Sequence, residues 1–403
     1  MTPTVVISRR GADRVRAGHP WIYQSDILEA EVESGDLVRV REERRRGIGW
    51  GLWSSQSQIA LRMMVVGSSG SLGSLGSEKD DIDERALFES RLRQAIDYRA
   101  TLAIDGTACR LVHGEADRLP ALIVDKYGDA SGEYLVVQTL CQGMDRRATL
   151  IVELLREIVR PRGVLARNDP KVRRLEGLEE RVDLLAGEIP ETVAVREGDV
   201  TFQADLRRGQ KTGLFLDQRE NHVVAASCAA GRALDAFTYN GGFALHLARR
   251  CSSVVALDSS EAAVALTRAN AAANGLTNLE AREANVFDEL RELEASGEHF
   301  DTIVLDPPAF AKNRAAVGRA LAGYKEINLR ALRLLAPGGH LITCSCSYHV
   351  DESTFVAVVT DAALDARVTV TLVEKRTQAR DHPVLVGVPE THYLKCLVLR
   401  KLG

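Results

Sequence analysis

The strand–helix alternation in the C-terminal half, from about residue 186 to residue 403, constrains the fold of this chain more than any other feature. Apolar runs of strand length lie at 231–237, 252–258, 279–287, 300–308 and 340–347. Segments with the apolar spacing of helices separate these runs, at 241–250, 260–275, 288–296 and 320–339. Such alternation predicts an α/β fold with a mainly parallel sheet and helices on both faces. The strand-like runs within 368–402 predict antiparallel strands at one edge.

The N-terminal half divides at a Gly/Ser-rich stretch, GSSGSLGSLGSEKDD, at residues 67–81. This composition is typical of a flexible linker. Short strand-like runs precede it, and mixed helical and strand-like segments follow it. We therefore predict a small β-rich domain at 1–66, a linker at 67–78, a small α+β domain at 79–185 and the α/β domain at 186–403.

Composition limits the kinds of site that need considering. The seven cysteines are scattered and form no CxxC pair, which argues against a disulfide framework or a zinc site and favours a reducing cytoplasm. No apolar run reaches the roughly 18 residues of a membrane span, and the N-terminus lacks the pattern of an export signal. We therefore expect a cytoplasmic protein that holds no metal and does not enter a membrane. The net charge of −4 does not decide whether nucleic acid binds, because local clustering of charge matters more.

A glycine turn after the first strand of the α/β domain, at 234–247, is the first candidate binding feature. Ligands of open parallel sheets bind beyond the carboxyl ends of the strands. Gly241 and Gly242 allow a close approach to a ligand, but their pattern is not the GxGxxG suited to a dinucleotide. Asp258 ends the next strand and can accept hydrogen bonds from a ribose, and 284–287 would lie beside an adenine. The set fits S-adenosylmethionine because no part of it is built for phosphates, although an ordinary glycine turn would explain 234–247 taken alone.

The fourth strand of this domain ends in VLDPPAF at 304–310. Because proline cannot donate to a sheet ladder, Pro307 and Pro308 must end the strand and stiffen the chain. Asp306 is suited to gripping the exocyclic amine or protonated ring nitrogen of a base, and Phe310 to stacking on it. Two other interpretations stay open. The prolines alone fit a strand-terminating turn, and the motif resembles the (D/N)PP(Y/F) signature of N6-adenine and other amino-methyltransferases.

The fifth strand ends in TCSCSYH at 343–349. Methylation of carbon 5 of a pyrimidine needs a thiolate to attack carbon 6 first, because carbon 5 is otherwise barely nucleophilic; methylation of an amine needs no such covalent step. A buried, inert cysteine is the usual fate of a cysteine in a strand. Cys344 and Cys346 point to the same side of an extended strand, so spacing does not choose between them. Position favours Cys346, which is nearer the strand end.

Several motifs occur together and in one order along nearly the whole chain: HPWIYQSDI, KTGLFLDQREN, FTYNGGFAL, LDPPAF, YKEINLRALRLLAPGG, SCS and DHPV followed by YLK. In this combination the chain resembles the bacterial 23S ribosomal RNA (cytosine-5)-methyltransferases that carry a PUA domain. The resemblance implies an N-terminal β-barrel PUA domain, a small central α+β domain and a C-terminal Rossmann-like class I methyltransferase domain. It also implies S-adenosylmethionine as the cofactor and ribosomal RNA as the partner, and a homodimer is a further expectation.

The resemblance assigns roles to the residues that match the motifs. Asp306 faces the target base together with Pro307, Pro308 and Phe310, and the nucleophile falls on Cys346. The expected cofactor residues are Asp235, Phe237, Asn240, Gly241 and Gly242 on the loop, Asp258 at the ribose, and Asn285 and Val286 at the adenine. Phe215 and Gln218 are further candidates for the methionine end, although an amphipathic entry segment would explain 211–221 almost as well.

Departures from the family pattern bear on the chemistry. Cys344 is extra relative to the family's core motif, which leaves some choice between the two thiols. No cysteine stands at the end of the fourth strand, where this chain has Pro307 and Pro308, so the group that removes the C5 proton is unassigned.

Arginine-rich stretches and exposed aromatic rings would provide contacts to RNA. The arginine-rich stretches are 41–46, 160–174 and 207–211. They would neutralise phosphates, although a charge run is usually a solvated face. The aromatic candidates of the first domain are Trp21, Tyr23, Trp50 and Trp53, and packing in a small barrel would explain them equally well. A non-enzymatic alternative is an RNA-binding assembly factor that retains an inactive methyltransferase fold.

Overall fold

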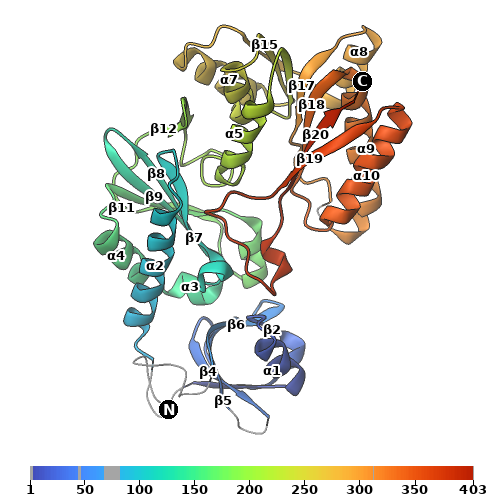
Figure 1. Cartoon of the computed structure of the whole chain (residues 1–403). Coiled ribbons are helices and arrows are strands. Elements are labelled where there is room, and N and C mark those ends of the chain that lie inside the picture. Colours follow the sequence, from blue (N-terminus) through green and yellow to red (C-terminus); the bar gives the residue numbers. More distant parts are fainter. Residues whose placement is uncertain (1–2, 44–46, 68–81, 312, 403) are drawn as a thin grey trace. The chain divides into compact units, whose positions relative to one another are not determined.

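Figure 1 shows the computed structural model of the chain, which describes residues 3–43, 47–67, 82–311 and 313–402. The chain forms two compact units. The first unit comprises Met1–Val195, Ala204–Leu214 and Arg380–Thr391. The second comprises Arg196–Gln203, Phe215–Ala379 and His392–Gly403. Residues 68–78 of the predicted linker lie outside the described part of the chain, and the four predicted segments stay a prediction.

A six-stranded sheet, in the order β2-β6-β5-β4-β1-β3, forms the N-terminal part of the first unit. Its strands are β1 (Thr4–Ile7), β2 (Trp21–Tyr23), β3 (Ile27–Ala30), β4 (Leu37–Glu42), β5 (Gly47–Trp53) and β6 (Ile59–Val66). Helix α1 (Arg9–Arg16) buries Ala12 and Val15 against this sheet. Trp50 and Trp53 are buried in the core, so they pack the sheet and are not available to stack on bases.

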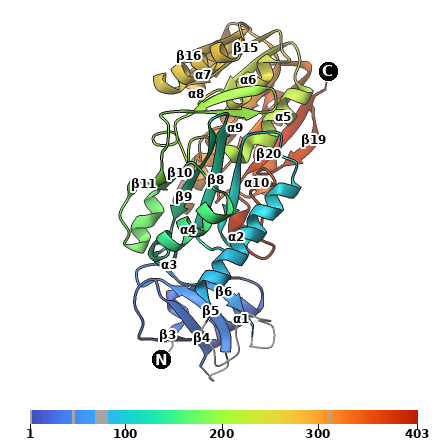
Figure 2. The same cartoon turned by 90° about the vertical axis from the view of Figure 1, so that its left-hand side faces the viewer.

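A five-stranded sheet, in the order β11-β10-β9-β8-β7, forms the rest of the first unit. Its strands are β7 (Ala108–His113), β8 (Leu122–Asp129), β9 (Gly132–Thr139), β10 (Gly163–Asn168) and β11 (Arg181–Gly187), and its helices are α2 (Glu84–Thr101), α3 (Gln142–Arg146) and α4 (Ala148–Ile158). Helices α2 and α4 share an apolar core with this sheet (Figures 1 and 2). The chain returns to this unit late: Asp381 Oδ2 accepts a hydrogen bond from the Arg110 amide at 2.9 Å, and Arg99 donates to the Asp381 carbonyl at 2.8 Å.

Part of the basic stretch at 160–174 is structural. The guanidinium groups of Arg167 and Arg173 are buried. Arg167 pairs with Asp169 at 2.9 Å, and Arg173 pairs with Asp145 at 2.9 Å. These two arginine side chains are therefore already paired inside the fold and are poor candidates for contacts to RNA phosphates.

The second unit contains a seven-stranded sheet in the order β16-β15-β14-β17-β18-β20-β19. Its strands are β14 (Arg232–Ala236), β15 (Ser253–Asp258), β16 (Leu279–Glu283), β17 (Phe300–Leu305), β18 (Leu335–Ser345), β19 (Val370–Arg376) and β20 (Lys395–Lys401). Strands β14 to β18 run parallel, whereas β20 is antiparallel to both of its neighbours. The predicted parallel sheet with an antiparallel edge is confirmed. The hairpin β12 (Val193–Glu197) and β13 (Val200–Ala204) precedes this sheet along the chain.

Helices cover both faces of this sheet because successive strand residues point to opposite sides. The helices are α5 (Arg219–Cys228), α6 (Gly242–Ala248), α7 (Glu261–Ala273), α8 (Val286–Ala295), α9 (Val317–Leu334) and α10 (Glu352–Ala366). One apolar core joins the sheet to α8, α9 and α10, and a second joins it to α5, α6 and α7. Helix α10 was not predicted. The fold thus leaves the carboxyl ends of the parallel strands for a site.

All seven cysteines are free thiols. Among the helices of the described residues, none combines the length and the apolar composition needed to cross a membrane.

Candidate active site

The carboxyl ends of β14 to β18 bring the predicted site residues to one edge of the seven-stranded sheet. The strand order reverses at β14, which lies between β15 and β17, and open α/β sheets bind ligands at such a point. The predicted residues at or just after these strand ends are Asp235 and Phe237 (β14), Asp258 (β15), Asn285 (β16), Asp306 (β17) and Cys346 (β18). These predicted residues therefore lie at one edge of the sheet, as the order of the strands led us to expect.

The loop between β14 and α6 has an unusual backbone. Phe237 and Tyr239 adopt left-handed conformations, with φ of 70° and 50°, and Gly241 has φ of 89°. An aromatic residue at positive φ is strained, and such strain persists only where the surroundings fix the backbone. Strain of this kind is concentrated at ligand-binding and catalytic loops.

Two polar side chains of α7 hold this loop in place. Thr267 Oγ1 donates to the Tyr239 carbonyl at 2.8 Å, and Asn270 Nδ2 donates to the Asn240 carbonyl at 3.0 Å. Both side chains are fully buried. Sequence reasoning missed them, although polar residues three positions apart on an otherwise apolar helix face are a usable signal.

Asp235 is a fully buried acid with an unpaired oxygen. Its Oδ2 accepts hydrogen bonds from the Thr238 hydroxyl at 2.6 Å and from the Ala244 amide at 2.9 Å. Its Oδ1 has no hydrogen-bond partner among the described residues. Burial raises the pKa of Asp235 to about 7, and the charge of Asp258 also raises it. A buried acceptor without a partner is costly, so this oxygen indicates a place for a ligand donor.

Glycine is required at position 242 because a histidine packs against it. A β-carbon on Gly242 would lie 2.8 Å from His222 Nε2. At Gly241 a β-carbon would meet the side chains of Leu245 and Thr267, both at 3.2 Å. The two glycines thus serve close packing behind the loop as well as its turn.

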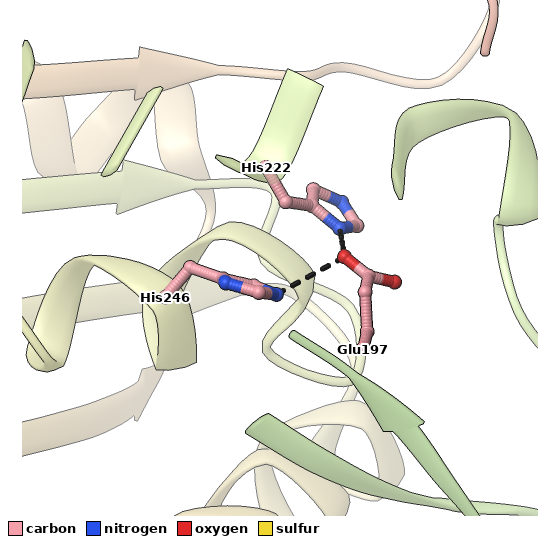
Figure 3. Close-up of side chains that lie close together, drawn as sticks. All are labelled: Glu197, His222 and His246. Atoms are coloured by element: carbon pink, nitrogen blue, oxygen red, sulfur yellow. Dashed lines mark hydrogen bonds and ion pairs between the residues drawn. The ribbon is translucent and has the colours of Figure 1, made fainter. Parts of the chain in front are cut away.

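Figure 3 shows His222, from α5, and His246, from α6, directed toward one carboxylate oxygen of Glu197. The distances to Glu197 Oε1 are 2.7 Å from His222 Nδ1 and 3.0 Å from His246 Nε2. All three side chains are buried. Burial alone would raise the pKa of Glu197, but the charge of His222 and the hydrogen bonds of both rings outweigh it and lower this pKa to about 2. The composition of the cluster is one that metal ions use, and both imidazole rings contact the same oxygen of the carboxylate.

The predicted ribose and adenine residues lie at the next two strand ends. Asp258 is half-buried, and its two carboxylate oxygens accept from the Tyr239 and Ser260 amides, each at 2.9 Å. Asn285 is exposed and caps α8 by accepting from the Phe287 amide at 3.0 Å. Val286 is buried in the core. These contacts orient Asp258 and Asn285 at the edge of the site.

The segment after β17 lies beside β14 and supports an aromatic cluster. The Asp306 amide donates to the Ala236 carbonyl at 3.3 Å, and the Asp306 side chain is half-buried. Pro307 is buried and Pro308 is exposed. Phe310 packs against Phe237, Phe287 and Tyr324, with ring centroids 6.4, 5.9 and 4.7 Å away. The ring expected to stack on a base is therefore also a packing residue.

The two cysteines of TCSCSYH have different surroundings. Cys344 is completely buried within β18 and is paired across the sheet with Cys396. A hydrogen bond with Cys396, together with burial, raises the pKa of Cys344 well above its usual value. Cys346 directly follows β18 and is half-buried, and its Sγ lies 3.9 Å from the Pro307 carbonyl oxygen. A thiol needs a low pKa and access to react, so the surroundings disfavour Cys344.

A buried hydroxyl network flanks Cys346, and sequence reasoning missed it. The Tyr324 hydroxyl lies 3.0 Å from Ser345 Oγ and 2.9 Å from Ser347 Oγ. Ser347 Oγ also accepts from the Ala311 amide at 3.1 Å. The residues on both sides of Cys346 are thus tied to one tyrosine, which fixes the position of the sulfur.

Part of the second predicted cofactor segment, residues 211–221, lies against the loop between β14 and α6. The Phe215 ring makes an edge-on contact with Tyr239, with centroids 5.2 Å apart. Gln218 is buried and accepts from the Asn221 amide group at 2.6 Å. Gln218 also hydrogen-bonds Cys344, so it packs behind β18.

Comparison with protein families gives two matches along the chain. Residues 5–65 match a PUA-like domain, and residues 174–400 match an S-adenosylmethionine-dependent methyltransferase family. The protein named ribosomal RNA large subunit methyltransferase I from Aeromonas salmonicida is 39% identical over 391 residues, covering 95% of each chain. The protein of the same name from Tolumonas auensis is 36% identical over 412 residues, covering 100% of each chain.

Solved structures share the fold at low sequence identity. A methyltransferase solved in complex with SAH superposes with a TM-score of 0.81 at 20% identity, over 99% of this chain and 100% of that one. An S-adenosylmethionine-dependent methyltransferase from Streptococcus mutans gives a TM-score of 0.79 at 19% identity, over 99% and 100%. The predicted PUA-plus-methyltransferase architecture and the predicted cofactor are therefore confirmed. This chain belongs to the S-adenosylmethionine-dependent methyltransferases, in the family that includes the proteins named ribosomal RNA large subunit methyltransferase I.

Proposed function

We propose that this protein forms 5-methylcytosine in the 23S RNA of the large ribosomal subunit through a covalent bond between Cys346 and carbon 6 of the cytosine. The observation that carries the proposal is the placement of Cys346. It follows β18 at the edge where β17 delivers Asp306, and its sulfur lies 3.9 Å from the Pro307 carbonyl. An amine methyltransferase would have no use for a thiol there. The names of the full-length relatives support ribosomal RNA as the substrate.

The cofactor residues fit S-adenosylmethionine. Asp235 offers an unpaired buried oxygen, and Asp258 offers a half-buried carboxylate for the ribose hydroxyls. Asn240, Gly241 and Gly242 form the loop between them, and the remaining predicted contacts are Phe215, Gln218, Phe237, Asn285 and Val286. Bound S-adenosylmethionine supplies a methyl group on a sulfonium. The protein holds it beside the pocket of Asp306 and Cys346.

The chemistry then follows from the thiolate. The electron pair of Cys346 Sγ forms a bond to carbon 6, and the π electrons of the C5–C6 bond shift toward N3, which makes carbon 5 nucleophilic. Carbon 5 would then bond to the methyl group as the bond between methyl and sulfonium breaks, with S-adenosylhomocysteine as the leaving group. Asp306 holds the base, with Pro307, Pro308 and Phe310 around it. Removal of the C5 proton by a base re-forms the double bond between carbons 5 and 6 and releases the cysteine as a thiolate. The cytosine must leave its stack to reach this pocket.

We assign RNA contacts outside the pocket to the PUA-like domain and to the basic segment at 207–211. Arg207, Arg208 and Lys211 are exposed. Such contacts bind phosphates with a strong dependence on salt and little on sequence. A homodimer, a cytoplasmic location and the division into domains at 1–66, 79–185 and 186–403 are part of the same proposal.

The decisive experiment uses RNA that contains 5-fluorocytosine. Fluorine at carbon 5 leaves no proton to remove, so the covalent adduct should persist and migrate slowly on a denaturing gel. Mapping of 5-methylcytosine in ribosomal RNA from a deletion strain would identify the position. An N-methylated base as the product, with no adduct, would favour the amine methyltransferase alternative. Absence of S-adenosylmethionine binding at micromolar levels would favour an inactive assembly factor.

A further inference from the structure

A buried lysine on β20, Lys395, contacts the residues on both sides of the proposed nucleophile, Cys346. Lys395 is only 3% exposed, and it pairs across the sheet with Ser345, the residue before Cys346. Its Nζ donates to the carbonyl of Ser347, the residue after Cys346, at 2.7 Å. A second hydrogen bond runs to the Tyr393 carbonyl at 2.9 Å. Lysine is almost never buried to this extent without a partner, so its position beside Cys346 needs an explanation.

Two acidic groups, Cys346 and Asp351, interact electrostatically with Lys395. Burial lowers the pKa of Lys395 to about 8. The negative charges of Cys346 and Asp351 act in the other direction and raise this pKa, and the effect of Cys346 is the larger. Asp351 caps α10, and its Oδ1 already accepts from the Thr354 amide at 2.7 Å. Tyr324, on α9, faces Cys346 as a neutral hydroxyl whose pKa is raised mainly by burial. At neutral pH Lys395 is therefore mostly an ammonium, and an ionised Cys346 is the group whose charge would stabilise it most.

We propose that Lys395 is the cationic partner that holds Cys346 as a thiolate, a role that rests on the covalent mechanism proposed above. The Sγ–H bond of Cys346 breaks, the proton passes to solvent, and the electron pair stays on sulfur beside the ammonium. A nearby cation lowers the pKa of a cysteine in this way. Lys395 acts through Cys346 and is a positioning residue.

The proposal also limits what Lys395 does later in the cycle. The electron pair of the sulfur enters the bond to carbon 6 and returns when the adduct resolves, again beside the ammonium. Because Nζ keeps its three protons throughout, it cannot accept the proton from carbon 5. Another group must do so.

The test measures the reactivity of the thiol, without RNA or cofactor. The rate of alkylation of Cys346 by iodoacetamide is followed against pH in the full-length protein, by mass spectrometry of the peptide that contains Cys346, with Cys346→Ser as the blank. Lys395→Met should raise the apparent pKa of Cys346 by about one unit or more, so that alkylation at pH 7 slows about tenfold. Lys395→Arg keeps the charge and should keep the reactivity.

Lys401→Met is a matched control on the same strand. Lys401 Nζ also donates to two backbone carbonyls, those of Leu332 at 2.9 Å and Leu335 at 2.6 Å, at the other end of β20. This variant should leave the alkylation profile unchanged. If Lys395→Met unfolds, Lys395→Gln retains a donor for the Ser347 carbonyl without the charge and is measured in the same way.

An unchanged apparent pKa in folded Lys395→Met or Lys395→Gln overturns the proposal, as does an equal shift in Lys401→Met. The proposed function fails separately. It falls if Cys346→Ser still forms 5-methylcytosine, whatever the alkylation profile shows.

Discussion

The two halves of the candidate site are built in different ways. The cofactor half, at the ends of β14 and β15, is shaped by backbone: two aromatic residues at positive φ, two crowded glycines and a buried acid with one oxygen unpaired. The nucleophile half, at the ends of β17 and β18, is shaped by side chains: Tyr324 binds two serines, and Lys395 binds the carbonyl after Cys346. The first half leaves a polar group open for a small ligand. In the proposed function, the second half holds one sulfur in place for a base of the RNA substrate.

This difference predicts separable defects. Changes in the cofactor half should alter S-adenosylmethionine affinity, and changes in the nucleophile half should alter turnover with affinity preserved. Single substitutions in each half test whether the two defects separate.

Replacement of the two thiols gives the largest contrast. Cys346→Ser should lower 5-methylcytosine formation more than about 10³-fold, because the covalent step loses its nucleophile. Cys344→Ser, at the buried position beside Cys396, should stay within about tenfold of the parent protein. Mass spectrometry of the product nucleosides measures both. Equal activity in the two variants would contradict the covalent mechanism.

Asp235→Asn should weaken S-adenosylmethionine binding and stabilise the ligand-free protein at high pH. The amide oxygen can still accept from Thr238 and Ala244, but the amide nitrogen cannot accept at the position of the unpaired Oδ1. We expect affinity to fall about 10- to 100-fold by calorimetry, as for loss of a charged hydrogen bond.

The stability of the same variant has a defined dependence on pH. The pKa of Asp235 is raised in the fold to about 7. The folded state therefore holds the proton more tightly than the unfolded chain, and stability is lost as pH rises from about 4 through 7. Asparagine does not titrate, so its melting temperature should exceed that of the parent protein at pH 8. A lower melting temperature of the variant at pH 8 would show that the fold does not raise the pKa of Asp235.

Gly242→Ala should destabilise the fold by about 1–3 kcal/mol, because the new β-carbon would crowd His222 Nε2. Gly318→Ala is a suitable control, since no atom lies within 4 Å of its β-carbon position in α9. That change should be neutral or stabilising by up to about 1 kcal/mol. Urea unfolding measures both, and similar losses in the two variants would contradict tight packing behind the loop.

Tyr324→Phe should have the smallest effect. It keeps the ring and removes the hydroxyl that binds Ser345 and Ser347, at a cost of about 1–2 kcal/mol in stability. Turnover should fall about three- to tenfold because the sulfur is held less firmly, and S-adenosylmethionine affinity should not change. A matching loss of affinity would mean that the two halves of the site are coupled.

The parts of the site that were predictable lie at strand ends. Parallel strands finish at the same edge, so Asp235, Asp258, Asp306 and Cys346 could be brought together from the order of the strands alone. Position along the strand and the family resemblance already favoured Cys346 over Cys344. The structure adds that Cys344 is fully buried whereas Cys346 is half-buried.

The parts that were not predictable depend on packing between elements distant in sequence. Tyr324, from α9, and Lys395, from β20, contact Ser347, the residue after Cys346. Both residues lie in motifs of the family pattern, but a motif does not show which residues its members contact. Helix α10 was missed because its valine and threonine residues also suit a strand. Trp50 and Trp53 were open to two interpretations until their burial was known.

The return of residues 380–391 to the first unit has a consequence for synthesis of the protein. Each unit is assembled from three separate stretches of the chain, and the last stretch of the first unit ends at Thr391. Asp381, which pairs with the Arg110 amide, is made some 270 residues after it. A ribosome must therefore synthesise the chain as far as Thr391 before the first unit has all of its parts, and a truncation anywhere before residue 391 leaves both units incomplete.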